Sequence, residues 1–345
     1  MKILVTGTTA GLNDETYIQE VLDRGAAEGL SIEYHNLIDE LELTHDKTLP
    51  KMLGTTNYIF ELLREREYCK IGFKLQENRC EHAIIRVPAT ILWNRVNLKL
   101  KDHKEIQNFI KPDVIVTLID AEWLMQNRLQ DTEYKTDEFH ASISRQNLTL
   151  QDILSWMNEE VSLSEDWAER LGIRHYVLPI GQGSKSLFNL VKHGNIPSFY
   201  VSYSMTHADK AGREEVNSVI KQLSDYGLVI DPQAIEISSA EHSKDDLQTI
   251  YSYTVHRDLH WFVGKVDAVV AIHPYYERPP LSTGMMDELG HARDYHKRRY
   301  MIFPPIKQSP FTTDSYIEKG HVFQNSHEFF LTLEAEGFTP LPDKV

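Results

Sequence analysis

Short apolar runs alternate with amphipathic segments along the first half of the chain. Residues 14–30 have helical spacing and begin at Asp14, a residue type that caps helix N-termini. The runs between such segments are short and end in turn residues, which predicts strands. They lie at residues 2–7, 31–37, 82–90, 113–120 and 174–181. Strands that alternate with helices predict a parallel sheet covered on both faces.

The same alternation lapses after residue 181 and restarts at residue 198. Further strand-like runs lie at residues 198–204, 228–231, 267–274 and 299–305. Segments with helical spacing separate them, at residues 213–227, 254–266 and 281–292. We place a domain boundary in the lapse. The sequence therefore predicts an α/β protein with two parallel-sheet, three-layer domains, residues 1–194 and 195–345.

Composition narrows the class of protein. The chain has 345 residues, 41% of them hydrophobic, and a formal net charge of −15. This charge, with no long basic run, argues against a nucleic-acid polymer as partner, because such binding relies on Lys and Arg. Cys69 and Cys80 form no CxxC pair, and the start MKILVTG does not resemble a signal peptide. No apolar run reaches the length of a membrane span, so we expect a cytoplasmic protein.

The stretch GTTAGLNDET follows the first strand and opens a helix, which is where a phosphate-binding loop belongs. Gly7 and Gly11 are its candidate nucleotide-binding residues. The loop lacks the lysine of the Walker pattern, and Gly11 comes one place early. Asn13 and Asp14 occupy the positions of the lysine and the hydroxyl residue, and a carboxylate there repels phosphate.

The first domain weakly resembles adenylate-kinase-like nucleotide kinases, through its order of elements and the segment HNLIDEL. The resemblance covers roughly the first 190 residues and implies a degenerate P-loop. Two alternatives to a kinase stay open. One is an α/β domain whose first turn simply requires glycine, and the other is a domain that binds a nucleotide without turnover.

In the second domain, one acidic residue lies in an apolar helix stripe. Met285, Leu289 and Ala292 fall at i, i+4 and i+7, and Glu288 lies between them. A carboxylate on the buried face suggests a group that faces a pocket. The alternative is that Glu288 lies at the edge of the stripe and reaches water.

The second domain resembles the nucleoside 2-deoxyribosyltransferase family and the related nucleoside 5′-monophosphate N-glycosidases. The matching segments are SFYVSYS, VIDP, RDLHWFVGKVDAVVAIHP and STGMMDELGHA, and the last is the most specific. The resemblance implies a flavodoxin-like or Rossmann-like domain, glycosyl transfer without a cofactor, and Glu288 as the nucleophile. A carboxylate below the sugar stabilises or bonds to the cationic C1′ of the transition state.

Other site residues follow from the same resemblance. Tyr203 is a candidate for orienting Glu288 or bonding the sugar, whereas Ser204 and His207 lie on the same ligand loop. Ser282 is typical of the monophosphate N-glycosidases, because a hydroxyl at a helix N-terminus suits a phosphate. An ordinary N-cap is compatible with that role. Gly284 allows a ligand to approach the backbone closely.

Asp258 is the candidate acid that protonates the leaving base. Arg213 opens the next helix and is a candidate phosphate contact, although a surface arginine is the alternative. His256 and His260 lie at i and i+4, but no third ligand is in register, so we predict no metal. The family relationship also implies a homo-oligomer.

The leading hypothesis is an enzyme that cleaves the N-glycosidic bond of a nucleoside or (deoxy)nucleoside 5′-monophosphate. Cleavage is by hydrolysis or by (deoxy)ribosyl transfer, and the sequence does not decide between them. The alternatives are a nucleotide kinase acting through the first domain, and a non-catalytic nucleotide sensor.

Overall fold

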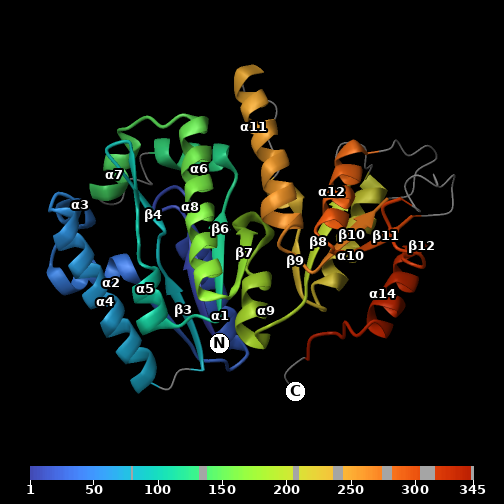
Figure 1. Ribbon diagram of the computed structural model, residues 1–345, viewed down its shortest axis with the longest axis horizontal. Helices are drawn as coiled ribbons and strands as arrows, with labels where there is room; N and C mark the ends of the chain where they lie inside the picture. Colours follow the sequence, from blue (N-terminus) through green and yellow to red (C-terminus); the bar gives the residue numbers. More distant parts are fainter. Residues whose placement is uncertain are drawn as a thin grey trace. The chain divides into compact units, whose positions relative to one another are not determined.

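The computed structural model describes residues 1–78, 81–131, 138–204, 210–235, 244–273, 282–303 and 315–342. The chain forms two compact units, residues 1–184 with 237–250, and residues 185–236 with 251–345 (Figure 1). The boundary that we expect at residues 194 and 195 remains a prediction. Across the described residues, every helix is too short or too polar to span a lipid bilayer.

The first unit is built on a parallel five-stranded sheet in the order β2-β3-β1-β6-β7. The strands are β1 (Lys2–Thr6), β2 (Ile32–Asn36), β3 (His82–Arg86), β6 (Val114–Ile119) and β7 (Arg174–Pro179). The predicted strand at residues 82–90 is divided: β3 ends at Arg86 and a small antiparallel hairpin follows. Its strands are β4 (Thr90–Trp93) and β5 (Val96–Lys99).

Helices cover both faces of this sheet (Figure 1). They are α1 (Asp14–Ala27), α2 (Leu37–His45), α3 (Leu49–Leu53), α4 (Asn57–Glu77), α5 (His103–Glu105), η1 (Ile106–Ile110), α6 (Glu122–Gln130), α7 (Glu138–Ser144), α8 (Leu150–Leu171) and η2 (Ile180–Gln182). The long α8 begins in a capping box of Thr149 and Asp152 and ends at Gly172, whose φ is 67°. It packs on β6 and β7.

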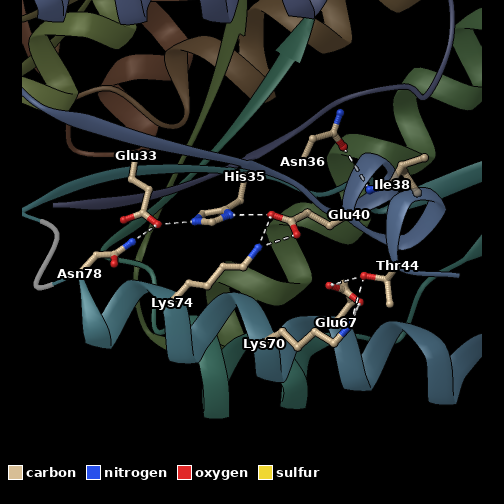
Figure 2. A network of polar contacts seen from close by, with 10 residues as sticks. All are labelled: Glu33, His35, Asn36, Ile38, Glu40, Thr44, Glu67, Lys70, Lys74 and Asn78. Carbon is tan, nitrogen blue, oxygen red and sulfur yellow. Dashed lines mark hydrogen bonds and ion pairs between the residues drawn. The ribbon is translucent and has the colours of Figure 1, made fainter. Parts of the chain in front are cut away.

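A network of hydrogen bonds and ion pairs connects β2 to α2 and α4 (Figure 2). The imidazole of His35 contacts Glu40 through Nδ1 at 2.9 Å and Glu33 through Nε2 at 2.8 Å. Lys74 of α4 donates to Glu40 at 2.8 Å, and Asn78 donates to Glu33 at 3.0 Å. The two glutamates therefore connect the edge strand of the sheet to the helices beside it.

The second unit has a parallel five-stranded sheet in the order β12-β11-β10-β8-β9. Its strands are β8 (Ser198–Tyr203), β9 (Leu228–Ile230), β10 (Ala268–Ile272), β11 (Arg298–Ile302) and β12 (Val322–Phe323). Counted from β8, the order is that of flavodoxin-like folds, and the chain reverses direction across the sheet between β8 and β10. The predicted fold class is thus confirmed for both units.

The helical segments of the second half are α9 (Lys185–His193), α10 (Lys210–Leu223), η3 (Pro232–Ile235), α11 (Lys244–His256), η4 (Arg257–Val263), α12 (Thr283–Asp294) and α14 (Ser326–Ala335). One face of the sheet packs on α10 and α14 in a core that includes Val201, Val216 and Phe329. On the other face, α12 contacts β8, β10, β11 and η4. This second layer carries the candidate site.

Candidate active site

The strand β8 presents two chemically different faces. Phe199, Val201 and Tyr203 belong to the apolar core on the α10 and α14 side. Because side chains alternate along a strand, Tyr200 and Ser202 lie on the opposite face. Both are fully buried. The face of β8 toward α12 therefore carries hydroxyl groups.

Helix α12 places Glu288 over that hydroxyl face. Ser282 caps the helix by accepting a hydrogen bond from the Met285 amide at 3.3 Å. Met285 and Leu289 are buried, as the apolar stripe predicts. The half-buried Glu288 accepts a hydrogen bond from Tyr200 Oη at 2.7 Å and a second from Ser202 Oγ. Its carboxylate thus points toward the sheet and not into bulk water.

The surroundings of Glu288 favour its neutral form. Burial of the carboxyl group, together with the negative charge of Asp258, raises the pKa of Glu288 to about 8. The hydrogen bonds from Ser202 and Tyr200 oppose this rise. A carboxyl group whose pKa is shifted so far by burial and a second acid is typical of a functional site.

Asp258 lies in η4 and is itself buried. Arg257 donates from Nε to Asp258 Oδ1 at 2.9 Å and from Nη1 to the Ile235 carbonyl at 3.3 Å. Burial raises the pKa of Asp258, whereas the adjacent guanidinium lowers it. Glu288 and Asp258 therefore form a pair of interacting acids in which one has a cationic partner.

Tyr203 has a different environment from the one that the sequence suggested. Its hydroxyl lies 3.1 Å from Asp231 Oδ1 and 3.0 Å from Gln233 Oε1, beyond the end of β9, and its single proton is donated to one of these two oxygens at a time. The sequence suggested two roles for Tyr203, orienting Glu288 or bonding the sugar. In the structure the tyrosine that contacts Glu288 is Tyr200, because strand alternation places the two tyrosines on opposite faces. A sugar contact for Tyr203 stays a prediction.

The remaining predicted residues belong to different elements of the second unit. Ser204 is buried at the end of β8, whereas Arg213 is exposed on α10. Gly284 is exposed in the first turn of α12, where an added Cβ meets only Ser282 Oγ at 3.9 Å. His207 lies outside the described residues, so its proposed role stays a prediction.

In the first unit, the glycine turn after β1 is held by internal contacts. The Gly7 amide donates to Glu160 Oε1 at 2.9 Å, and the Gly7 carbonyl accepts from Arg86 Nη2 at 3.0 Å. The Gly11 carbonyl accepts from Arg128 Nη1 at 2.9 Å. Both glycines have positive φ angles, 152° and 80°, which explains the residue type. Nucleotide binding at Gly7 and Gly11 stays a prediction.

Sequence reasoning missed a third histidine near His256 and His260. His291 of α12 lies with its ring centroid 4.8 Å from that of His260, which in turn lies 4.8 Å from His256. Burial and the neighbouring His260 lower the pKa of His291. Within the described parts of the chain, no group of three or more His, Cys, Asp or Glu side chains has a metal-binding arrangement.

No protein-family model matches this sequence, and no curated protein matches it either. Among solved structures, the chain is similar to a shikimate kinase from Bacteroides thetaiotaomicron, with 12% identity and a TM-score of 0.30. That match covers 50% of this chain and 99% of the kinase. The chain is also similar to a 2-deoxyribosyltransferase from Leishmania mexicana, with 13% identity and a TM-score of 0.26. This second match covers 41% of this chain and 99% of the transferase. Structural similarity at this level does not indicate a shared activity.

Proposed function

We propose that the second unit cleaves the N-glycosidic bond of a nucleoside or (deoxy)nucleoside 5′-monophosphate, with Glu288 as the nucleophile. The observation that carries this proposal is the position of the Glu288 carboxylate. Two hydroxyl groups of β8 hold it on the sheet side of α12. Ser202 is the penultimate residue of β8, and β8 and β10 flank the topological switch point, beside which open α/β sheets bind ligands.

In the proposed reaction, ionised Glu288 attacks C1′ of the sugar. The C1′–N bond breaks, its electron pair stays with the base, and the base takes up a proton from Asp258. The resulting glycosyl ester on Glu288 is then cleaved by water, which gives hydrolysis, or by a second base, which gives transfer. Tyr200 and Ser202 fix the orientation of the carboxylate. Ser282 and the N-terminus of α12 are the proposed contacts for a 5′-phosphate.

The proposed roles require a neutral Asp258 and an ionised Glu288, so the negative charge with which Asp258 raises the pKa of Glu288 must be absent in the reacting form. A neutral Asp258 has a proton to give, and burial favours that form, although Arg257 opposes it. Glu288 must lose its proton before attack, and its pKa of about 8 means that only a minority of free enzyme is ionised at neutral pH. Positive charge that develops on the sugar in the transition state attracts the ionised carboxylate. This attraction offsets the free energy that deprotonation of Glu288 costs.

Base release is the direct test. The full chain is incubated with each ribo- and deoxyribonucleoside and its 5′-monophosphate, and free base is separated by chromatography. We expect release by the wild type and by Asp287→Asn, an exposed neighbour on the same helix, but none by Glu288→Gln. If no substrate yields base, the enzyme hypothesis is lost. A ligand-induced rise in melting temperature with intact ligand would then favour the nucleotide sensor instead.

A further inference from the structure

Arg257 is a buried arginine to which the proposed reaction gives no role. It is the first residue of η4, and only 4% of it is exposed. Its Nε donates to Asp258 Oδ1 at 2.9 Å, and its Nη1 donates to the Ile235 carbonyl at 3.3 Å. Guanidinium groups stay protonated in folded proteins. This residue therefore brings a permanent positive charge into the core of the second unit.

Phe262 lies between this charge and the tyrosine that holds Glu288. The guanidinium carbon of Arg257 is 5.7 Å from the centroid of the Phe262 ring. That ring is stacked on Tyr200, with the centroids 6.2 Å apart, and Tyr200 donates to Glu288 Oε1 at 2.7 Å. Arg257 thus bonds Asp258 directly and is separated from Glu288 by two packed aromatic rings.

The two acids differ in the kind of donor that each receives. Asp258 is bonded by a cation, whereas the described donors to Glu288 are the neutral hydroxyl groups of Tyr200 and Ser202. A hydroxyl group can donate or accept, so it can bond a carboxylate or a neutral carboxyl group. A guanidinium can only donate, and its charge favours the carboxylate form of its partner. When the pair holds one proton, these contacts place that proton on Glu288.

The electrostatics of the pair agree with this distribution. Burial raises the pKa of Asp258, but the charge and the hydrogen bond of Arg257 oppose the rise. Burial and the charge of Asp258 raise the pKa of Glu288 to about 8. At neutral pH the free protein therefore has a protonated Glu288 beside an ionised Asp258. The proposed reaction requires the opposite arrangement.

We propose that Arg257 is a positioning residue that holds the proton shared by Asp258 and Glu288 on Glu288 in the free enzyme. This inference rests on the proposed function, in which the reacting form has that proton on Asp258. To reach the reacting form, one proton passes from the Glu288 carboxyl group to the Asp258 carboxylate, and the net charge of the pair does not change. Through its bond to Asp258, Arg257 sets how often the reacting form is populated.

Infrared spectroscopy of the free, full-length protein locates this proton without any substrate. The C=O stretch of a neutral carboxyl group is separate from the bands of a carboxylate. Raising the pH from about 6 to about 9 should remove this stretch as Glu288 ionises. The band is assigned to Glu288 if it disappears in Glu288→Gln and shifts when the glutamate carboxyl groups carry a heavy carbon isotope.

Three variants separate the charge of Arg257 from its packing. Arg257→Gln removes the charge, so the band should lose its glutamate isotope shift and become that of Asp258. Arg257→Lys keeps the charge and should leave the band on Glu288. Arg293→Gln removes an exposed arginine of α12 and should match the wild type. The wild-type and Arg257→Lys spectra test the proposal even if Arg257→Gln does not fold.

Base release supplies a kinetic test of the same residue. A cation beside two coupled acids lowers both apparent pKa values of the pair, so its removal raises both. In Arg257→Gln, both limbs of the pH profile of kcat/KM should therefore move to higher pH, by about one unit or more. Arg257→Lys should restore the wild-type profile. A purely structural role would lower the rate and leave the pH profile in place.

Three results overturn the proposal. The first is a wild-type protein whose proton lies on Asp258 at neutral pH. The second is a band that stays on Glu288 in Arg257→Gln, and the third is a pH profile that this variant leaves in place. Absence of base release from every substrate would instead overturn the proposed function, because the infrared measurement does not depend on turnover.

Discussion

Replacing Glu288 by Gln should stabilise the second unit at alkaline pH. The folded protein holds the proton of this carboxyl with a pKa of about 8, against an ordinary value of 4.5 in an unfolded chain. Below pH 4.5 both states are protonated, and the glutamate carries no penalty. Between the two values the unfolded chain releases the proton while the folded one keeps it, so the free energy of unfolding falls as pH rises.

The magnitude follows from the size of the pKa shift. Each pH unit between the two pKa values costs about 1.4 kcal/mol, so the penalty levels off above pH 8 at a few kcal/mol, about 5 at most. Glutamine resembles the protonated glutamate in shape and hydrogen bonding but does not ionise. The variant should therefore match the wild type at low pH and exceed its stability by this penalty at high pH.

Urea unfolding at about pH 5, 7 and 9 measures this difference, and hydrogen exchange of β8 and β10 peptides identifies the transition of the second unit. Asp287→Asn, on the same helix but exposed, is the control and should show no comparable gain. An equal pH dependence of wild type and Glu288→Gln would refute the reasoning, because it would mean that the carboxyl group titrates normally. A variant less stable than the wild type at about pH 9 would do the same.

Three further substitutions give distinct outcomes. Tyr200→Phe removes a donor to the Glu288 carboxylate, so base release should slow about tenfold and the acid limb of kcat/KM should move to higher pH, seen in steady-state kinetics. An unchanged pH profile would contradict this role. Glu160→Gln should destabilise the first unit by about 3 kcal/mol or more in urea, because the buried carboxylate accepts from Gly7 and from the start of the β4 hairpin. A loss below about 1 kcal/mol would count against that account. Asp102→Ala leaves the buried Arg64 of α4 without its carboxylate, so the free energy of unfolding in the same assay should fall by about 3 to 5 kcal/mol. An unchanged free energy of unfolding would mean that water solvates the guanidinium instead.

The sequence predicted the helices and strands better than it predicted which of them lie next to one another. Buried runs at residues 113–120 and 267–274 became β6 and β10, because a strand covered on both faces needs a continuous apolar run. The helical period also predicted α12, with Glu288 on the helix face that carries Met285 and Ala292. Strand order is set by contacts between residues far apart in the chain, and no local pattern reports it. The division of the strand at residues 82–90 was missed for the same reason, since β4 is held by α8.

The partner of Glu288 was missed although the sequence contains a signal for it. In SFYVSYS, Ser198, Tyr200, Ser202 and Ser204 share one face, whereas Phe199, Val201 and Tyr203 share the other. A strand covered on both faces that carries only hydroxyl residues on one of them requires polar partners there. Reading the faces separately would have pointed to Tyr200 and not to Tyr203. What the sequence does not contain is which helix covers the hydroxyl face.

The glycine turn of the first unit shows where a motif stops being informative. Gly7 and Gly11 reveal that the backbone needs positive φ angles, and the structure has them. Glycine spacing does not reveal what the backbone amides of the turn bind. Glu160, more than 150 residues away, accepts from the Gly7 amide, and this contact depends on where α8 crosses the sheet. A loop whose amide is bound by a carboxylate of its own chain has less capacity for phosphate. The glycine pattern therefore predicts the backbone geometry of the turn but not a phosphate site.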